Sequence, residues 1–186
     1  MNIEILAYQN RYREALINLV LPIQQLEFNV PITLAEQPDL QDAGNFFHHF
    51  HLGKGGFWLA LAKGEVVGSV GLLNIGNGQA CLRKMFVHKD FRGKEFGIAQ
   101  KLLDTLTDFM KEEGLSDVFL GTRADLYAAR RFYEKNGFDL IEKENLPVNF
   151  PIMGVDSHFY RKRIYNIIVS VRDKINTVII SPERPI

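Results

Sequence analysis

The strongest constraint on the fold is a helix-forming segment, residues 98–113, that lies between two stretches with the composition of buried strands. Its apolar residues recur at the spacing of one helix face: Ile98, Leu102, Leu103, Leu106, Phe109 and Met110. Gly114 follows at a position where glycine commonly ends a helix. The strand-like stretches are residues 80–87 before the helix and 117–121 after it. A strand, a helix and a strand in this order predict one parallel crossover.

The remaining pattern predicts a sheet that begins antiparallel and becomes mixed. The strands that we expect are residues 2–8, 57–62, 65–73, 80–87, 117–121, 138–142 and 158–164. The expected helices are residues 12–28, 38–51, 98–113 and 128–136. Pro22 should kink or divide the first of them, and Lys63-Gly64 and Asn77-Gly78 have the composition of tight hairpin turns. The fold class is therefore α/β with a mixed α+β sheet.

The length suits one domain, and the charges of the chain balance. Among 186 residues, 22 Lys and Arg stand against 22 Asp and Glu, so the clustered positive charge that nucleic acids and anionic membranes require is missing. We expect residues 1–164 to form a single domain and residues 165–186 to extend it. Cys81 is the single cysteine and cannot form an internal disulfide, and neither a signal-peptide pattern nor a membrane-spanning run is found. These features predict a cytoplasmic protein without a nucleic-acid or membrane partner.

The turn that leads into residues 98–113 has the chemistry of an anion site. The first turn of a helix carries unpaired N–H groups and a partial positive charge, which favour a bound phosphate. Gly93 and Gly97 let the backbone approach a ligand, and Arg92 and Lys94 add positive charge. The sequence lacks both GxxxxGK[ST] and a GxGxxG after the first strand, so two common nucleotide sites are excluded. A pyrophosphate site is our interpretation; a plain connection with a solvated basic pair is the alternative.

Two motifs in this chain resemble the GNAT superfamily of N-acetyltransferases. Residues 92–99, RGKEFGIA, are similar to its acetyl-CoA-binding motif, Gln/Arg-x-x-Gly-x-Gly/Ala, except that Glu95 replaces the first glycine. Residues 128–138, AARRFYEKNGF, are similar to its later helix, although Leu126 stands where the family often has Asn. With residues 85–87 before the loop, the resemblance covers about residues 57–142.

The resemblance implies a GNAT-like acyl-CoA N-acyltransferase fold in which two central strands splay apart. In this family the pantetheine arm of acetyl-CoA lies in the gap, hydrogen-bonded like an added strand, and the pyrophosphate reaches the loop before the helix. The implied cofactor-binding residues are Met85, Phe86, Val87, Arg92, Gly93, Lys94, Glu95, Phe96, Gly97, Ile98 and Ala99.

The same resemblance suggests candidate catalytic residues. Tyr133 matches the position of the general acid, whose hydroxyl protonates the departing thiolate. No base is identified from the sequence alone; Glu27 is our candidate because its region lines the acceptor side in the family, with His88 or water as alternatives. The cluster of His48, His49 and His51 lacks the spacing of a helical metal site, and we expect no metal. Cys81 has no adjacent His and is better explained as a small buried residue.

The resemblance therefore implies an acetyl-CoA-dependent N-acetyltransferase that acts by direct attack of a primary amine. The acceptor is a small molecule or a peptide, and we expect residues 146–153 together with Phe28, Phe57 and Trp58 to cover its site. A non-catalytic acyl-CoA-binding sensor is the alternative. Two β-prone runs within residues 165–186 raise a third possibility, pairing with a second copy of the chain, against an ordinary packed tail.

Overall fold

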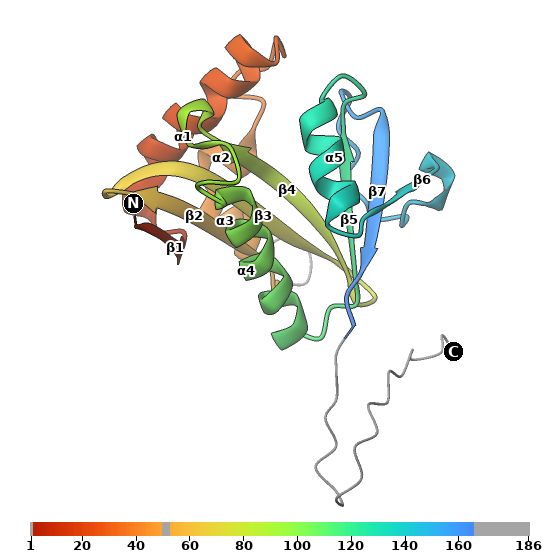
Figure 1. Cartoon of the computed structure of the whole chain (residues 1–186). Coiled ribbons are helices and arrows are strands. Elements are labelled where there is room, and N and C mark those ends of the chain that lie inside the picture. The colour runs from red at the N-terminus through yellow and green to blue at the C-terminus, as the bar shows by residue number, and fades with distance from the viewer. Residues whose placement is uncertain (1, 50–52, 166–186) are drawn as a thin grey trace, which may run out of the picture.

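The computed structural model describes residues 2–49 and 53–165, which build a seven-stranded sheet. The strands are β1 (Ile3–Ala7), β2 (Gly56–Ala62), β3 (Glu65–Gly76), β4 (Gln79–Val87), β5 (Asp117–Thr122), β6 (Asp139–Ile141) and β7 (His158–Arg163). Their order across the sheet is β1-β2-β3-β4-β5-β7-β6 (Figure 1). Among the paired strands described, β4 and β5 run parallel and the other pairs are antiparallel. The predicted mixed sheet and its parallel crossover are confirmed.

Helices cover both faces of this sheet and enclose two separate apolar cores. The longer helices are α1 (Arg13–Pro22), α3 (Ala43–His49), α4 (Ile98–Glu112) and α5 (Tyr127–Lys135), with α2 (Pro38–Gln41) as a short turn before α3. Single turns form η1 (Asn10–Tyr12), η2 (Ile23–Glu27), η3 (Lys89–Phe91) and η4 (Lys143–Asn145). One core joins α4 and α5 to the sheet, and the other joins α1 and α3 to the opposite face. We name these the α4 face and the α1 face.

Pro22 divides the first helical region without ending it. The residue closes α1 with helical angles (φ −62°, ψ −37°), and the chain continues as the π-helical turn η2. The N–H of Phe28 there donates to the carbonyl of Ile23 at 3.0 Å, five residues back. Proline has no N–H to offer, and the wider turn absorbs the change in the hydrogen-bond ladder.

The two parallel strands separate after a short paired stretch. β4 pairs with β5 through Gln79, Ala80 and Cys81, and then continues to its end paired only with β3, while β5 stays paired with β7 (Figure 1). A bulge in β4 accompanies the separation: the pairing with β3 passes from Arg83 to Phe86 across a single β3 residue, which leaves two β4 residues opposite one. Bulges bend the strand that carries them. The splayed central strands implied by the resemblance are therefore confirmed.

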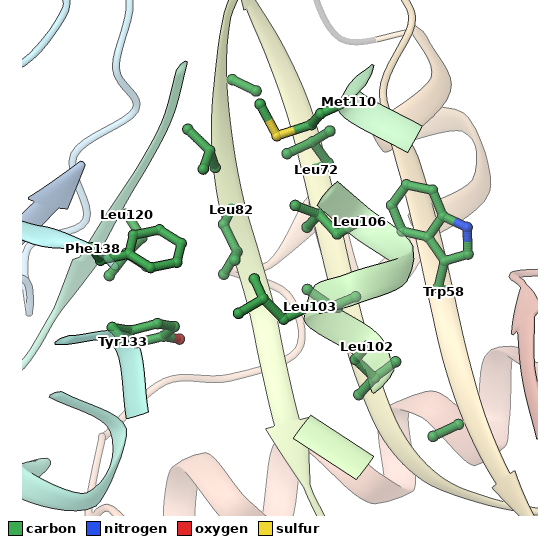
Figure 2. Packing of buried hydrophobic residues seen from close by; sticks show 14 of the residues in the cluster. Trp58, Leu72, Leu82, Leu102, Leu103, Leu106, Met110, Leu120, Tyr133 and Phe138 are labelled. Atoms are coloured by element: carbon green, nitrogen blue, oxygen red, sulfur yellow. The ribbon is translucent and has the colours of Figure 1, made fainter. Parts of the chain in front are cut away.

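The core on the α4 face reaches the opened pair from both sides. Figure 2 shows Leu103 and Leu106 of α4 against Leu82 of β4, while Tyr133 and Phe138 lie on the β5 side with the ring of Tyr133 turned toward β4.

Placing β7 between β5 and β6 was not predicted from the sequence. Within the described residues, no helix is long and apolar enough to cross a membrane. The predicted extension and its pairing with a second copy fall almost wholly on residues 166–186, outside the described part of the chain.

Candidate active site

A cavity of about 210 Å³ lies between the separated strands. Its walls include Met85 and Phe86 of β4, Gly121 of β5, Tyr133 of α5 and Phe150 of the late loop. Tyr133 and Met85 belong to the core on the α4 face, whereas Phe86 and Phe150 belong to the α1 face. The cavity therefore connects the two faces of the sheet through the gap, because the open strand edges offer no pairing to close it.

Tyr133 lines this cavity, and the acceptor of its hydroxyl proton there is weak. The side chain is buried, and its ring packs edge-on against Phe138 at 5.4 Å between centroids. The hydroxyl lies 3.7 Å from the sulfur of Met85, which is a weak acceptor. Burial raises the pKa of Tyr133 above its ordinary value, so the phenol keeps its proton throughout the neutral and mildly alkaline range.

The start of α4 follows β4 through a loop of ten residues, 88–97. Gly97 occupies the position before the helix with φ of 62°, in the left-handed region that favours glycine. Its N–H donates to the carbonyl of Gly93 at 3.2 Å, which closes the loop into a compact turn. The next N–H groups, in the first turn of α4, have no acceptor inside the helix. They remain suited to an anion.

The carboxylate of Glu95 lies against Gly93 of this loop. A Cβ atom added to Gly93, whose φ is 115°, would collide with the carboxylate of Glu95. The absence of a side chain at residue 93 thus makes room for Glu95, which is exposed to solvent. Lys94 is exposed as well, so positive and negative charges both flank the turn.

Arg92 and Glu27, predicted for two different tasks, are paired with each other. The guanidinium Nη2 of Arg92 lies 2.8 Å from Oε2 of Glu27, and its Nε donates to the carbonyl of Val87 at 2.8 Å. Glu27 is not among the residues that line the cavity. Its assignment as a base and that of Arg92 as a phosphate ligand stay predictions.

The α1 face carries a buried charged cluster that sequence reasoning missed. Nη2 of Arg83 lies 3.0 Å from Oδ2 of Asp39, and Nζ of Lys84 lies 3.3 Å from Oδ1 of the same carboxylate. Lys84 also donates to the side chain of Gln37. Burial lowers the pKa of Lys84, and the carboxylate of Asp39 opposes that effect.

A backbone distortion explains why this cluster was missed. Neighbouring residues of a regular strand point to opposite faces, so Arg83 and Lys84 would be expected to separate. Lys84 has φ of 51° within the β4 bulge, and both side chains reach Asp39. Two consecutive cations inside a strand that is otherwise largely buried were the available signal.

Several other expected positions are now placed. Phe28 and Phe150 line the cavity, whereas Phe57 and Trp58 are packed into the two cores and do not. Cys81 is buried at the cavity wall, and burial raises the pKa of its thiol to about 12. Among residues 2–49 and 53–165, no three His, Cys, Asp or Glu side chains are grouped so as to hold a metal ion.

This sheet, opened between β4 and β5, has the architecture of the acyl-CoA N-acyltransferases. The model of the Acetyltransferase (GNAT) family matches residues 18–138, and the chain belongs to that family. A GNAT-family acetyltransferase of Staphylococcus aureus Mu50 superimposes with a TM-score of 0.82 at 36% identity, over 88% of this chain and 99% of the other. The PaiA N-acetyltransferase of Thermoplasma acidophilum, solved with coenzyme A, shares the fold with a TM-score of 0.69 at 19% identity, over 88% and 99% of the two chains.

Curated relatives match over shorter stretches. The probable N-acetyltransferase family 8 member 5 of Mus musculus is 36% identical over 107 residues, which are 55% of this chain and 45% of that protein. The N-acetylaspartate synthetase of Danio rerio is 40% identical over 83 residues, 44% of this chain and 29% of that protein. This chain matches less than half the length of either relative.

Proposed function

We propose that this protein transfers the acetyl group of acetyl-CoA to a primary amine by direct attack. The observation that carries the proposal is the hydroxyl of Tyr133, held in a cavity between two separated parallel strands. Membership of the GNAT family supports it. The acceptor is a small molecule or a peptide.

The chain offers a fitting place for the coenzyme. Beyond Cys81, the edge of β4 that faces the gap has no paired neighbour strand, which suits the amide groups of a pantetheine arm alongside residues 85–87. The loop of residues 92–99, with Gly97 left-handed at the entrance of α4, then offers the N–H groups of a helix start to the pyrophosphate. Lys94 adds a positive charge, while Glu95 holds a negative charge beside it.

Tyr133 is assigned as the general acid. A thiolate that leaves the thioester has a conjugate pKa near 8.5, so a proton delivered to the sulfur lowers the barrier near neutral pH. The hydroxyl of Tyr133 keeps its proton because burial raises its pKa, and Met85 offers it only a weak acceptor. Neither the attack of the amine nor the protonation of the sulfur requires a metal ion in this proposal.

We place the protein in the cytoplasm. The single thiol, Cys81, is buried and free, which suits a reducing compartment.

We also propose that residues 165–186 extend the same domain and pair two copies of the chain. Analytical ultracentrifugation of the full chain and of a chain ending at residue 164 tests the pairing. A loss of mass beyond the deleted residues supports it, and two monomers contradict it.

Calorimetry and a thiol-release assay test the function together. We expect acetyl-CoA to bind with one site per chain, and free coenzyme A to appear only when an acceptable amine is present. Binding without release for any amine, peptides included, would contradict the enzyme and favour the sensor.

A further inference from the structure

The cavity has a chemically distinct half on the α1 face. Its polar lining includes three side chains from different parts of the chain: Gln24, Arg83 and Asp156. None of them belongs to the coenzyme loop or to α5. They lie across the sheet from Tyr133, whose core is on the α4 face.

Arg83 is the cation of this half that keeps free donors. Its Nη2 faces Asp39 and the sulfur of Met153, each at 3.0 Å, and among the described residues Nε and Nη1 have no hydrogen-bond partner. The other two cations of the cavity wall are engaged. Lys84 is held by Gln37 and Asp39, while Arg123 bonds to Asp125 and to the carbonyl of Phe28.

The free donors of Arg83 suit an anion. Arg83 and Lys84 share the buried carboxylate of Asp39, and Asp156 brings a second carboxylate to the same half, so its formal charges balance and its cation and carboxylate suit a ligand that carries both charges. The side chain of Arg83 is only 13% exposed, so water does little to screen it. A guanidinium with free N–H groups in such a place matches the geometry of a carboxylate.

Asp156 brings a carboxylate to the opposite wall. Its Oδ2 accepts from the N–H of Met153 at 3.1 Å, and Oδ1 has no hydrogen-bond partner among the described residues. Gly121 of β5 makes this approach possible, because a Cβ atom there would collide with the carboxylate. Burial raises the pKa of Asp156, with Arg83 acting in the opposite sense.

Gln24 supplies an unpaired acceptor at the same cavity. Its Oε1 atom is buried and accepts no hydrogen bond from any described residue. The residue lies on the π-helical turn η2, a kind of turn that is frequent at functional sites. A buried acceptor without a protein donor is available to a ligand N–H at this place.

We propose that the acceptor is a small amino acid-like molecule, whose carboxylate binds Arg83 while its amine lies between Asp156 and Oε1 of Gln24. The inference rests on the proposed acetyl transfer and names the acceptor class for the same cavity. Asp156 is then the proton acceptor and Arg83 the residue that determines specificity. The whole cavity measures about 210 Å³, and the acceptor shares it with the end of the coenzyme arm, so a small molecule fits this half better than a folded protein surface.

The proposed step balances as follows. The ammonium of the acceptor gives one proton to Asp156, and the freed amine forms a C–N bond with the thioester carbon. The C–S bond then breaks, the sulfur takes the proton of Tyr133, and the second nitrogen proton returns to the tyrosine oxygen. Asp156 releases its proton to water, so the products are an amide, coenzyme A and one proton.

Matched pairs of amines test the recognition of the carboxylate. Each α-amino acid of a panel is compared with the amine that lacks its carboxylate, by thiol release and by calorimetry in the presence of coenzyme A. For the wild-type protein we expect the amino acid to be preferred by about tenfold to a hundredfold in kcat/KM, the range of a charge-assisted contact. Equal use of both members, or preference for the simple amine, would overturn the inference.

Two variants assign the roles. Arg83→Lys keeps a positive charge near Asp39 but loses the guanidinium fork, and we expect KM to rise about tenfold more for the amino acid than for the simple amine. In Asp156→Asn we expect kcat to fall about 10²- to 10⁴-fold and the rising limb of the pH profile to disappear. Equal effects of Arg83→Lys on both amines, or an unchanged pH profile in Asp156→Asn, would contradict the assignment.

Failure of the inference is distinguishable from failure of the proposed function. Affinity for acetyl-CoA should be the same in the wild type and in both variants, as measured by calorimetry. A wild type that acetylates only amines without a carboxylate retains the function and refutes the inference. A wild type that binds acetyl-CoA and releases no coenzyme A with any amine refutes both. The amine comparison on the wild type needs no variant, so a folding defect in a variant does not decide the result.

Discussion

The carboxylate of Glu27 and the guanidinium of Arg92 form an ion pair at 2.8 Å although 65 positions separate them in the sequence. The pair ties the end of η2 to the segment that follows β4, and Arg92 also bonds to the carbonyl of Val87. Both side chains are partly exposed, so the pair itself stabilises the fold by no more than about 1 kcal/mol. Its consequence is geometric, because it directs Arg92 toward η2.

The variant Glu27→Gln separates positioning from proton transfer. Because the carboxylate is engaged by Arg92, we expect kcat to fall by less than about tenfold, with the main effect on acetyl-CoA affinity. Steady-state kinetics across pH measure both quantities. A fall of about 10²-fold or more with an altered pH profile would identify Glu27 as the base in place of Asp156.

Two substitutions at Gly97 separate strain from blockage. Gly97→Ala must keep a left-handed φ, and we expect it to cost about 1–2 kcal/mol in the free energy of unfolding. In Gly97→Trp the added bulk covers the first turn of α4, and we expect acetyl-CoA binding to be lost in a folded protein. Denaturant unfolding and calorimetry provide the two measurements.

Gly114 is a matched control for this experiment. It follows α4 with a φ of 70°, and an added Cβ would meet open space. Gly114→Ala should therefore show similar strain with no loss of acetyl-CoA affinity. Full affinity in Gly97→Trp would exclude the loop as the pyrophosphate site.

The hydroxyl of Tyr133 is tested by Tyr133→Phe, which leaves the ring and its packing in place. We expect kcat to fall about 10²- to 10⁴-fold while the acetyl-CoA dissociation constant is nearly unchanged. Burial raises the pKa of Tyr133, so activity of the wild type should not decline through ionisation of this residue below about pH 10. Wild-type turnover of the variant, measured where chemistry limits the rate, would show that the hydroxyl is not the acid.

Cys81 should be chemically inert in the folded protein. Its thiol is buried with a pKa of about 12, so almost none is thiolate at pH 8. We expect a thiol reagent to react at least a hundredfold more slowly with the native protein than with the protein in denaturant. Rapid labelling of the native protein would mean that the cavity wall opens readily.

Sequence reasoning succeeded where local chemistry decides the structure. The apolar stripe of α4 and the glycines beside it determine a helix start whatever the rest of the chain does, and Tyr133 follows from a motif on one helix. These signals lie within short segments. They predicted the start of α4 and a helix that carries Tyr133 to the cavity wall, while the roles of coenzyme site and acid stay predictions.

The proposed acceptor side depends on contacts between distant segments. Arg83 meets Asp39 from the α2 turn, and Asp156 reaches the cavity because Gly121 leaves space in another strand. The expectation for Phe57 and Trp58 was wrong because both are needed inside the cores. No periodicity within one segment reports such pairings, since they arise only when the sheet closes.

The bulge in β4 links the proposed acceptor site to the length of a strand. Lys84, with its left-handed backbone, is one residue more than regular pairing with β3 allows. Deleting it would restore strict alternation of the side chains along β4. The residues on one side of the deletion would then point to the opposite face of the sheet from the face that they occupy now. With the proposed acceptor site, substrate preference would depend on the count of residues in β4 as well as on their identity, and an insertion or deletion there would be a route to a new acceptor that side-chain exchange alone does not provide.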